Sequence, residues 1–170
     1  MTRILVVMDA LDGIQAYKDT TVGMLLEARR RGYATEVASI GDLWAENGDL
    51  RIRALPIEVS DDPDHWYRAG EPRTREAGEF SAVLMRKDPP VDMRYFYATQ
   101  LLDLAQRDGV PVVNNPQSLR DGNEKLAALW FREWTPPTLV SGRGERLREF
   151  VIGQGRAVLK PLEGMGGQGV

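Results

Sequence analysis

Three glycines and a lysine near position 160 form a pattern that could bind phosphate. Residues 164–169 read Gly-Met-Gly-Gly-Gln-Gly and satisfy the spacing G-x-G-x-x-G. A dinucleotide site needs a strand before this motif, a helix after it and an acidic residue about 20 positions further on, and only the strand is predicted here. As a phosphate loop, Gly164, Gly166 and Gly167 would bring backbone N–H groups to a polyphosphate, and Lys160 would add a cation. A flexible polar turn beside a surface lysine is equally compatible with these residues.

A second group of polar residues follows the apolar run 111–113. Asn114, Asn115 and Ser118 come directly after it, and Lys125 lies a few residues further on. In open α/β sheets ligands bind at the carboxyl ends of the strands, so these side chains are candidates for a binding site. Their commonest role is different, because Asn and Ser usually cap turns and helix starts, and a helix lysine is usually solvated.

Arg86 begins a third candidate group, Arg86-Lys87-Asp88-Pro89-Pro90, which follows the apolar run 82–85. Two cations and one acid at the end of a strand could bind a carboxylate, and arginine would do so through two parallel hydrogen bonds. The alternative is a surface ion pair that contributes little.

The elements that must position these residues alternate between strands and helices. Buried or alternating apolar residues predict strands at 4–8, 33–40, 82–85 and 111–113. Helices are predicted from a cap at 19–21 to Arg31, and from about Asp92 to Arg107. This alternation is typical of an α/β domain with a parallel sheet. Residues 50–59 are predicted to be an extended excursion, and the polar residues 60–79 a long loop.

A second region begins near residue 121. It is predicted to contain a helix at 123–134, a break at Pro136-Pro137, a strand at 138–140, a helix at 145–152 and a strand at 157–160. We therefore divide the chain into a domain over residues 1–120 and the start of a second domain over residues 121–170.

The composition excludes several classes of protein. The 170 residues are 42% hydrophobic and 28% charged, and no apolar run approaches the length of a membrane helix. The net charge of −3 argues against a nucleic-acid binder. The sequence has no cysteine and one histidine, which excludes disulfides, thiolate metal sites and histidine-based triads. Without a signal peptide at its start, the chain is expected to be cytoplasmic.

Three stretches, in this order and spacing, resemble bacterial glutathione synthetases. They are VLMRKDPPVDMRYFYATQLL at 83–102, VVNNPQSLRDGNEKLAALWF at 112–131 and VLKPLEGMGGQGV at 158–170. The opening RILVVMDALDGI and the later TPPTLVS are also similar. The resemblance covers essentially the whole chain. It implies a Rossmann-like pre-ATP-grasp domain without a dinucleotide site, followed by the beginning of an ATP-grasp domain.

The resemblance also implies an activity. Members of this family are ATP-dependent carbon–nitrogen ligases that join γ-glutamylcysteine to glycine through an acyl phosphate, giving glutathione, ADP and phosphate. They require Mg²⁺ (or Mn²⁺), and a homo-oligomer is expected for the full-length enzyme. Such chemistry depends on positioning and charge neutralisation rather than on a protein nucleophile.

Site residues follow from the resemblance by position. Lys125 and Lys160 match the family's ATP-contacting lysines and would act as phosphate stabilisers, and Gly164, Gly166 and Gly167 match a mobile loop over the triphosphate. Substrate-binding candidates are Arg86, Asn114, Asn115 and Ser118. No metal ligand is expected within this chain, because the family's metal ligands lie beyond the matched part. The chain is therefore expected to be an amino-terminal portion that forms no glutathione alone, which an assay of purified 1–170 checks.

Three alternatives stay open at this point. A sister ATP-grasp ligase could act on another carboxylate and amine. An oxidoreductase could use the parallel sheet and the G-x-G-x-x-G spacing to bind NAD(P). A noncatalytic binding or dimer-forming module would need neither chemistry.

Overall fold

The computed structural model describes residues 1–62 and 64–163. It divides into two compact units, Met1–Leu119 and Arg120–Val170.

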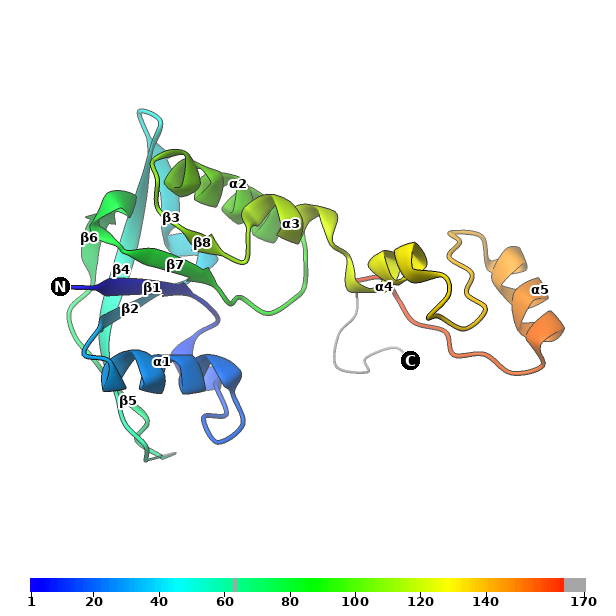
Figure 1. Cartoon of the computed structure of the whole chain (residues 1–170), viewed down its shortest axis with the longest axis horizontal. Helices are drawn as coiled ribbons and strands as arrows, with labels where there is room; N and C mark the ends of the chain where they lie inside the picture. Colours follow the sequence, from blue (N-terminus) through cyan, green and yellow to red (C-terminus); the bar gives the residue numbers. More distant parts are fainter. Residues whose placement is uncertain (63, 164–170) are drawn as a thin grey trace. The chain divides into compact units, whose positions relative to one another are not determined.

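Four parallel strands form the centre of the first unit (Figure 1). They are β1 Arg3–Val7, β2 Ala34–Ala38, β7 Ala82–Met85 and β8 Val112–Val113, in the spatial order β2-β1-β7-β8. In this register Val7 lies between Ala38 on one side and Met85 on the other. The predicted α/β class and the predicted strand at 82–85 are therefore confirmed.

Helices cover both faces of this sheet, which explains why β1 is apolar along its length. α1 Thr20–Arg30 and α2 Met93–Arg107 lie on opposite sides of it in Figure 1. Leu5 and Val7 pack in a core cluster with α2 residues, whereas Val6 joins a separate cluster with α1 residues. Successive side chains of a strand point to opposite faces, so β1 supplies apolar residues to both clusters.

The sheet is mixed rather than wholly parallel, because β4 Asp49–Val59 runs antiparallel to β2. β3 Leu43–Glu46 forms a hairpin with β4 through Asn47 and Gly48, which have φ angles of 54° and 93°. Positive φ at both central residues is typical of the two-residue turns that match the twist of antiparallel strands. The predicted extended segment at 50–59 is thus a strand of the sheet.

The segment 60–79 contains two strands, so the prediction of a long loop is wrong there. β5 Tyr67–Ala69 and β6 Arg73–Glu76 both pair with β4 in antiparallel fashion. Short 3₁₀ turns complete the first unit at Leu11–Gly13, Ile40–Asp42 and Ala77–Glu79. β4 therefore pairs with four other strands, namely β2, β3, β5 and β6.

An aspartate caps the amino-terminal end of each of the two long helices, α1 and α2. The carboxylate of Asp19 accepts hydrogen bonds from the N–H groups of Thr21 and Val22 at 2.7 and 3.0 Å, and Asp92 accepts one from Tyr95 at 2.9 Å. The predicted cap at 19–21 is confirmed. These contacts satisfy backbone donors that have no partner within the helix.

Replacement of Asp92 by alanine is expected to lower the free energy of unfolding by about 1 kcal/mol, because it removes the cap of α2. Urea unfolding measures this loss. Asp61→Ala, which alters an exposed loop aspartate, is the matched control and should change stability little. Equal losses in the two variants would contradict the capping role.

Glu79 belongs to a network of ion pairs near the amino-terminal end of β1. It accepts a hydrogen bond from the backbone N–H of Glu76 at 3.0 Å and contacts Arg75 at 2.9 Å. The backbone hydrogen bond first, and Arg75 with it, hold the pKa of the Glu79 carboxyl below its usual range. A lowered folded-state pKa stabilises the protein above the unfolded-state pKa, and this stabilisation is lost as the pH falls through the folded-state value.

The stability difference between the wild type and Glu79→Gln should therefore be present above about pH 4.5 and disappear in more acidic solution. Urea midpoints measured from pH 7 to pH 3 check this. Glu71→Gln removes an exposed carboxylate that makes no ion pair among the described residues, and it serves as the control. A difference that is constant with pH would contradict the assignment.

The second unit is built from short helices. They are α4 Glu124–Ala127, the 3₁₀ turn Ala128–Phe131 and α5 Gly144–Gln154, whereas α3 Pro116–Asp121 spans the boundary between the two units. The helix predicted at 145–152 is confirmed, but 138–140 and 157–160 form no strand. From Arg120 to Glu163 no described residue is fully buried, and Trp130 and Trp134 are 72% and 84% exposed.

Across the described residues, none of the helices combines the length and the apolar character needed to cross a membrane.

Candidate functional site

The candidate substrate-binding residues lie at the carboxyl ends of parallel strands. Asp9 follows β1, Arg86 follows β7 and Asn114 follows β8, and these three strands are neighbours in the sheet. Parallel strands end at the same edge, so their following residues are brought to that edge although they are far apart in sequence.

A hollow of 360 Å³ lies at this edge, between the ends of β1 and β7 and the start of α1. Its polar lining includes Asp9, Lys18, Asp19, Thr21, Arg86 and Asp88. The volume falls in the range of small-molecule sites. Two cationic and three carboxylate side chains in one hollow are a suitable arrangement for a ligand that carries both charges.

Arg86 is held from two directions. Its backbone N–H donates to the carbonyl oxygen of Val7 at 2.7 Å, and its Nε donates to the hydroxyl of Thr21 at 3.2 Å. Within the described residues its two terminal nitrogens make no hydrogen bond. The structure therefore fixes the base of a guanidinium in the hollow and leaves its terminal donors available for a ligand.

Asp9 orders the segment that follows β7. One of its carboxylate oxygens lies 2.8 Å from Lys87 Nζ, and the other accepts the backbone N–H of Asp88 at 3.0 Å. Lys87 is largely covered, with 17% of its side chain exposed. The ion pair considered for the Arg86–Pro90 segment is thus formed by Lys87, while Arg86 points elsewhere.

Asn114, Asn115 and Ser118 are exposed, and none of them lines the hollow. The side-chain oxygen of Asn115 accepts the backbone N–H of Ser118 at 3.0 Å, at the start of α3. Asn115 therefore has the capping role that was the alternative to ligand binding. Of the four substrate-side candidates, the hollow contains only Arg86.

The two candidate lysines belong to the second unit. Asn123 caps α4 by accepting the N–H of Lys125 at 2.9 Å, and its amide donates to the carbonyl oxygen of Leu162 at 3.2 Å. Lys125 Nζ lies 2.9 Å from Glu124 and 3.4 Å from the same carbonyl oxygen. The start of α4 therefore adjoins the segment that carries Lys160.

Lys125 and Lys160 both lower the pKa of the Glu124 carboxyl. The hydrogen bond of Glu124 with Lys125 is the largest cause, and the charge of Lys160 acts in the same direction. Because Lys125 Nζ contacts the carbonyl oxygen of Leu162, two residues after Lys160, the two lysines belong to neighbouring segments of the second unit. Such a pair can stabilise phosphate oxygens.

Two further groups were considered for this site. Gly164, Gly166 and Gly167 lie outside the described residues. In the part of the chain that the structure describes, no three His, Asp or Glu side chains gather where they could hold a metal ion.

Sequence reasoning missed Asp9, Lys18 and Thr21 as members of the hollow. Asp9 carried a signal, because it directly follows a buried strand, as Arg86 does. Lys18 and Thr21 carried none beyond their position before and at the helix start. Their role depends on the start of α1 lying beside the ends of β1 and β7.

Comparisons with known proteins cover the whole chain. The family model described as "Prokaryotic glutathione synthetase, N-terminal domain" matches residues 2–120, and "Prokaryotic glutathione synthetase, ATP-grasp domain" matches residues 124–170. A glutathione synthetase of Ralstonia nicotianae is 46% identical over 99% of this chain and 52% of its own length. Those of Xanthomonas axonopodis pv. citri and Shewanella oneidensis are 48% and 43% identical, over 98% and 100% of this chain and 53% and 54% of their own lengths. The chain spans about half the length of the curated relatives it matches.

Proposed function

This chain belongs to the prokaryotic glutathione synthetase family, and from that premise we propose that it provides substrate- and ATP-binding parts of a glutathione-forming ligase. Residues 1–120 would form the pre-ATP-grasp domain and residues 121–170 the beginning of the ATP-grasp domain. The full-length ligase is this chain together with the further half that its relatives possess. We place it in the cytoplasm as a homo-oligomer that acts on small molecules.

The reaction joins γ-glutamylcysteine to glycine in two steps. A carboxylate oxygen of the cysteinyl residue attacks the γ-phosphorus of ATP, the bond to the bridging oxygen breaks, and ADP leaves with that electron pair. The glycine amine then attacks the carbonyl carbon of the acyl phosphate. Phosphate departs, the nitrogen loses a proton and the amide bond remains. Both steps need charge stabilisation and alignment rather than a nucleophilic side chain.

The substrate assignment rests on one observation, which is that Arg86 lines the hollow with its terminal nitrogens free of hydrogen bonds to described residues. γ-Glutamylcysteine has two carboxylates and one ammonium group, and the hollow offers Arg86 and Lys18 beside Asp9, Asp19 and Asp88. The terminal nitrogens of Arg86 would bind a carboxylate that takes no part in the reaction. Asn114, Asn115 and Ser118, near the same edge of the sheet, would contribute weaker contacts.

Lys125 and Lys160 are proposed to bind the ATP phosphates, with Gly164, Gly166 and Gly167 closing over them. Their support is the shared contact of Asn123 and Lys125 with the carbonyl oxygen of Leu162, two residues after Lys160. ATP would be used with Mg²⁺ or Mn²⁺. The ion would supply charge neutralisation at the phosphate oxygens.

Calorimetric titration of the purified protein with ATP, NADH and γ-glutamylcysteine tests the proposal. We expect saturable binding of ATP and γ-glutamylcysteine but not of NADH. In the full-length ligase, release of phosphate from ATP should require γ-glutamylcysteine, and formation of glutathione should require glycine as well. Binding of NADH without ATP would reject the ligase and favour the oxidoreductase.

A further inference from the structure

An arginine-lined hollow of 730 Å³ opens at the amino-terminal end of the parallel strands. Arg3 belongs to β1, and Thr35 and Glu36 belong to β2 near its start. The candidate substrate site lies after the carboxyl ends of the same strands. The two hollows are therefore at opposite edges of the sheet and share no lining residue.

Positive charge dominates this hollow. Five arginines line it, namely Arg3, Arg29, Arg68, Arg73 and Arg75, against two glutamates. The chain as a whole has a net charge of −3. An excess of cations in one concave region of an acidic protein focuses a local field that attracts anions.

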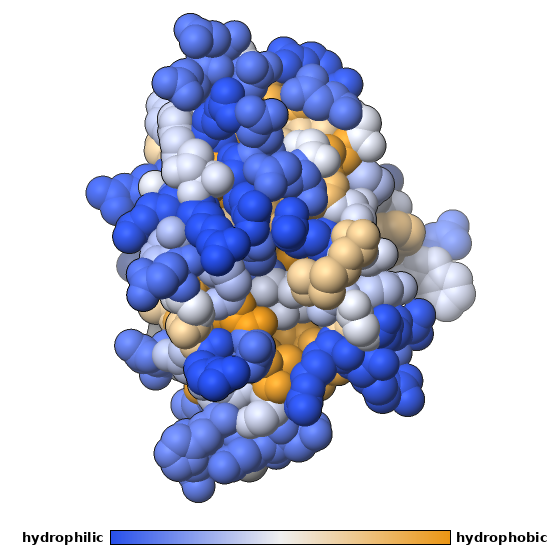
Figure 2. Space-filling view, turned by 90° about the vertical axis from the view of Figure 1, so that its left-hand side faces the viewer, coloured by the Kyte–Doolittle hydropathy of each residue, from blue (hydrophilic) through white to orange (hydrophobic). Residues whose placement is uncertain are grey.

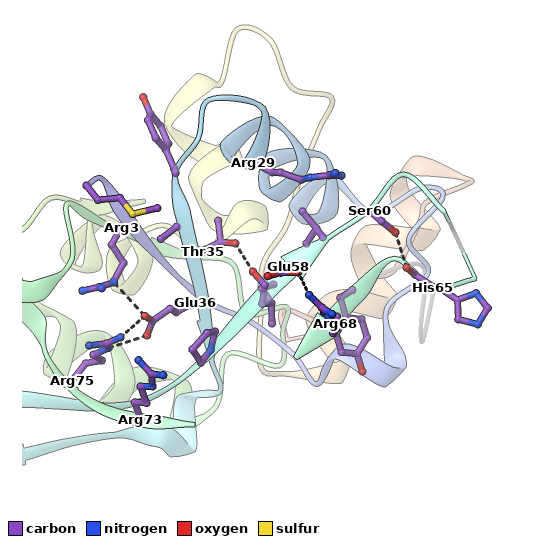
Figure 3. Close-up of a pocket in the computed structure, with 17 residues that line it drawn as sticks. Arg3, Arg29, Thr35, Glu36, Glu58, Ser60, His65, Arg68, Arg73 and Arg75 are labelled. Carbon is purple, nitrogen blue, oxygen red and sulfur yellow. Dashed lines mark hydrogen bonds and ion pairs between the residues drawn. The ribbon is translucent and has the colours of Figure 1, made fainter. Parts of the chain in front are cut away.

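The two glutamates are already paired with arginines. Glu36 is buried, with 4% of its side chain exposed, and lies 2.8 Å from Arg75 and 3.2 Å from Arg3. Glu58 pairs with Arg68 at 2.5 Å. Figure 3 shows Arg3 and Arg75 converging on Glu36 from β1 and β6. These contacts hold three guanidinium groups in the wall of the hollow.

Arg29 and Arg73 have no such partner. Arg29 extends from the last turn of α1 and Arg73 begins β6, and both are exposed. Among the described residues neither makes an ion pair or a side-chain hydrogen bond. Their charge is therefore not neutralised within the described part of the protein.

The floor of the hollow is apolar. Ile57 and Val59 of β4 are 6% and 3% exposed, and Pro56, Tyr33 and Tyr67 lie beside them. Figure 2 looks onto this side of the protein, where hydrophilic residues surround a smaller apolar area. A ligand that fits such a site combines anionic groups with an apolar body, and the volume is that of a small-molecule pocket.

We propose that this hollow is a second ligand site, which binds a small organic anion with at least two negative charges through Arg29 and Arg73. Planar guanidinium groups match phosphate and carboxylate oxygens equally well in geometry. The shared chemistry is a multiply charged oxyanion, and its source is either a phosphate ester or a polycarboxylate.

Calorimetric titration with phenyl phosphate and with phthalate, at low ionic strength, tests the proposal and separates the two sources. We expect at least one probe to bind the wild type with saturation, and Arg73→Ala or Arg29→Ala to weaken that binding about tenfold, because each removes a charge-assisted contact. Arg94→Ala removes an exposed arginine on the first turn of α2 and should leave binding unchanged. Urea unfolding of each variant verifies that it remains folded.

Phenyl phosphate is also expected to occupy the proposed ATP-phosphate site, so Lys160→Ala is titrated in parallel. Binding that survives in Lys160→Ala and is weakened in both Arg73→Ala and Arg29→Ala supports the second site. Absence of saturable binding of either probe to the wild type would overturn it. So would binding that depends on Lys160 and is unaffected in the two arginine variants.

Discussion

Replacement of Arg86 by alanine will lower kcat/KM for γ-glutamylcysteine about 100-fold or more in the full-length ligase, with little change in the KM for ATP. The backbone N–H of Arg86 donates to the carbonyl oxygen of Val7, its Nε donates to the hydroxyl of Thr21, and its terminal nitrogens have no partner among the described residues. A hydrogen bond to a charged group contributes about 1.5–3 kcal/mol, and two parallel bonds to one carboxylate would both be lost. Each 1.4 kcal/mol corresponds to a factor of about ten.

Two further variants make this prediction specific. Arg86→Lys keeps the charge but loses the planar pair of donors, so it should recover only part of the activity. Arg94→Ala removes an exposed arginine from the same unit and should behave as the wild type. If Arg86→Ala raises the KM for ATP instead, Arg86 belongs to the nucleotide side of the reaction and the substrate assignment fails.

Lys160→Ala will weaken ATP binding about tenfold or more and reduce turnover about 100-fold in the full-length ligase. Lys160 is exposed, and its charge acts on Glu124 beside Lys125, so the two lysines would share the phosphates. Removing a group that stabilises charge in the transition state typically costs a factor of about 100 to 1,000 in rate. Equilibrium titration gives the ATP affinity, and release of phosphate gives the rate.

The matched control is Arg148→Ala, which removes an exposed cation from α5 of the same unit. It should leave both quantities unchanged. Lys125→Ala should resemble Lys160→Ala, and the double variant should lose less than the product of the two single effects, because both lysines act on one ligand. Unchanged ATP affinity in Lys160→Ala would reject the phosphate role.

Much of the first unit is predictable because its signals are local. The apolar run at 82–85 is a strand with the expected bounds, and Asp19 caps α1 as its position before the helix suggests. β6, in contrast, reads Arg-Thr-Arg-Glu and has no fully buried residue. Its strand conformation comes from pairing with β4, which a pattern of apolar residues cannot reveal.

The opposite error occurs in the second unit. Val158 and Leu159 suggest a buried strand, yet both are exposed and the segment is not in a sheet. A strand needs a neighbour for its backbone hydrogen bonds, and from Arg120 to Glu163 the described residues supply none. The apolar side chains of Val158 and Leu159 therefore indicated a segment that tends to be buried, but they could not indicate whether a neighbouring strand is present.

The candidate site divides in the same way. Arg86 was found because it follows an apolar strand within a distinctive local sequence. Asp9 could not be joined to it from the sequence because its proximity depends on the pairing of β1 with β7, and Thr21 could not because its contact depends on where α1 lies. Local sequence identified the charged group, whereas the sheet topology determined what surrounds it.

The central place of β1 also constrains how this unit can fold. β1 precedes both of its partner strands in the chain, and these begin at Ala34 and Ala82. During synthesis one edge of β1 can pair with β2 early, whereas the other must stay open until β7 has emerged. Such a long separation in sequence between paired strands slows folding and leaves an apolar edge exposed to other chains. Until β7 has been synthesised, the open edge of β1 is therefore the part of this unit most exposed to aggregation.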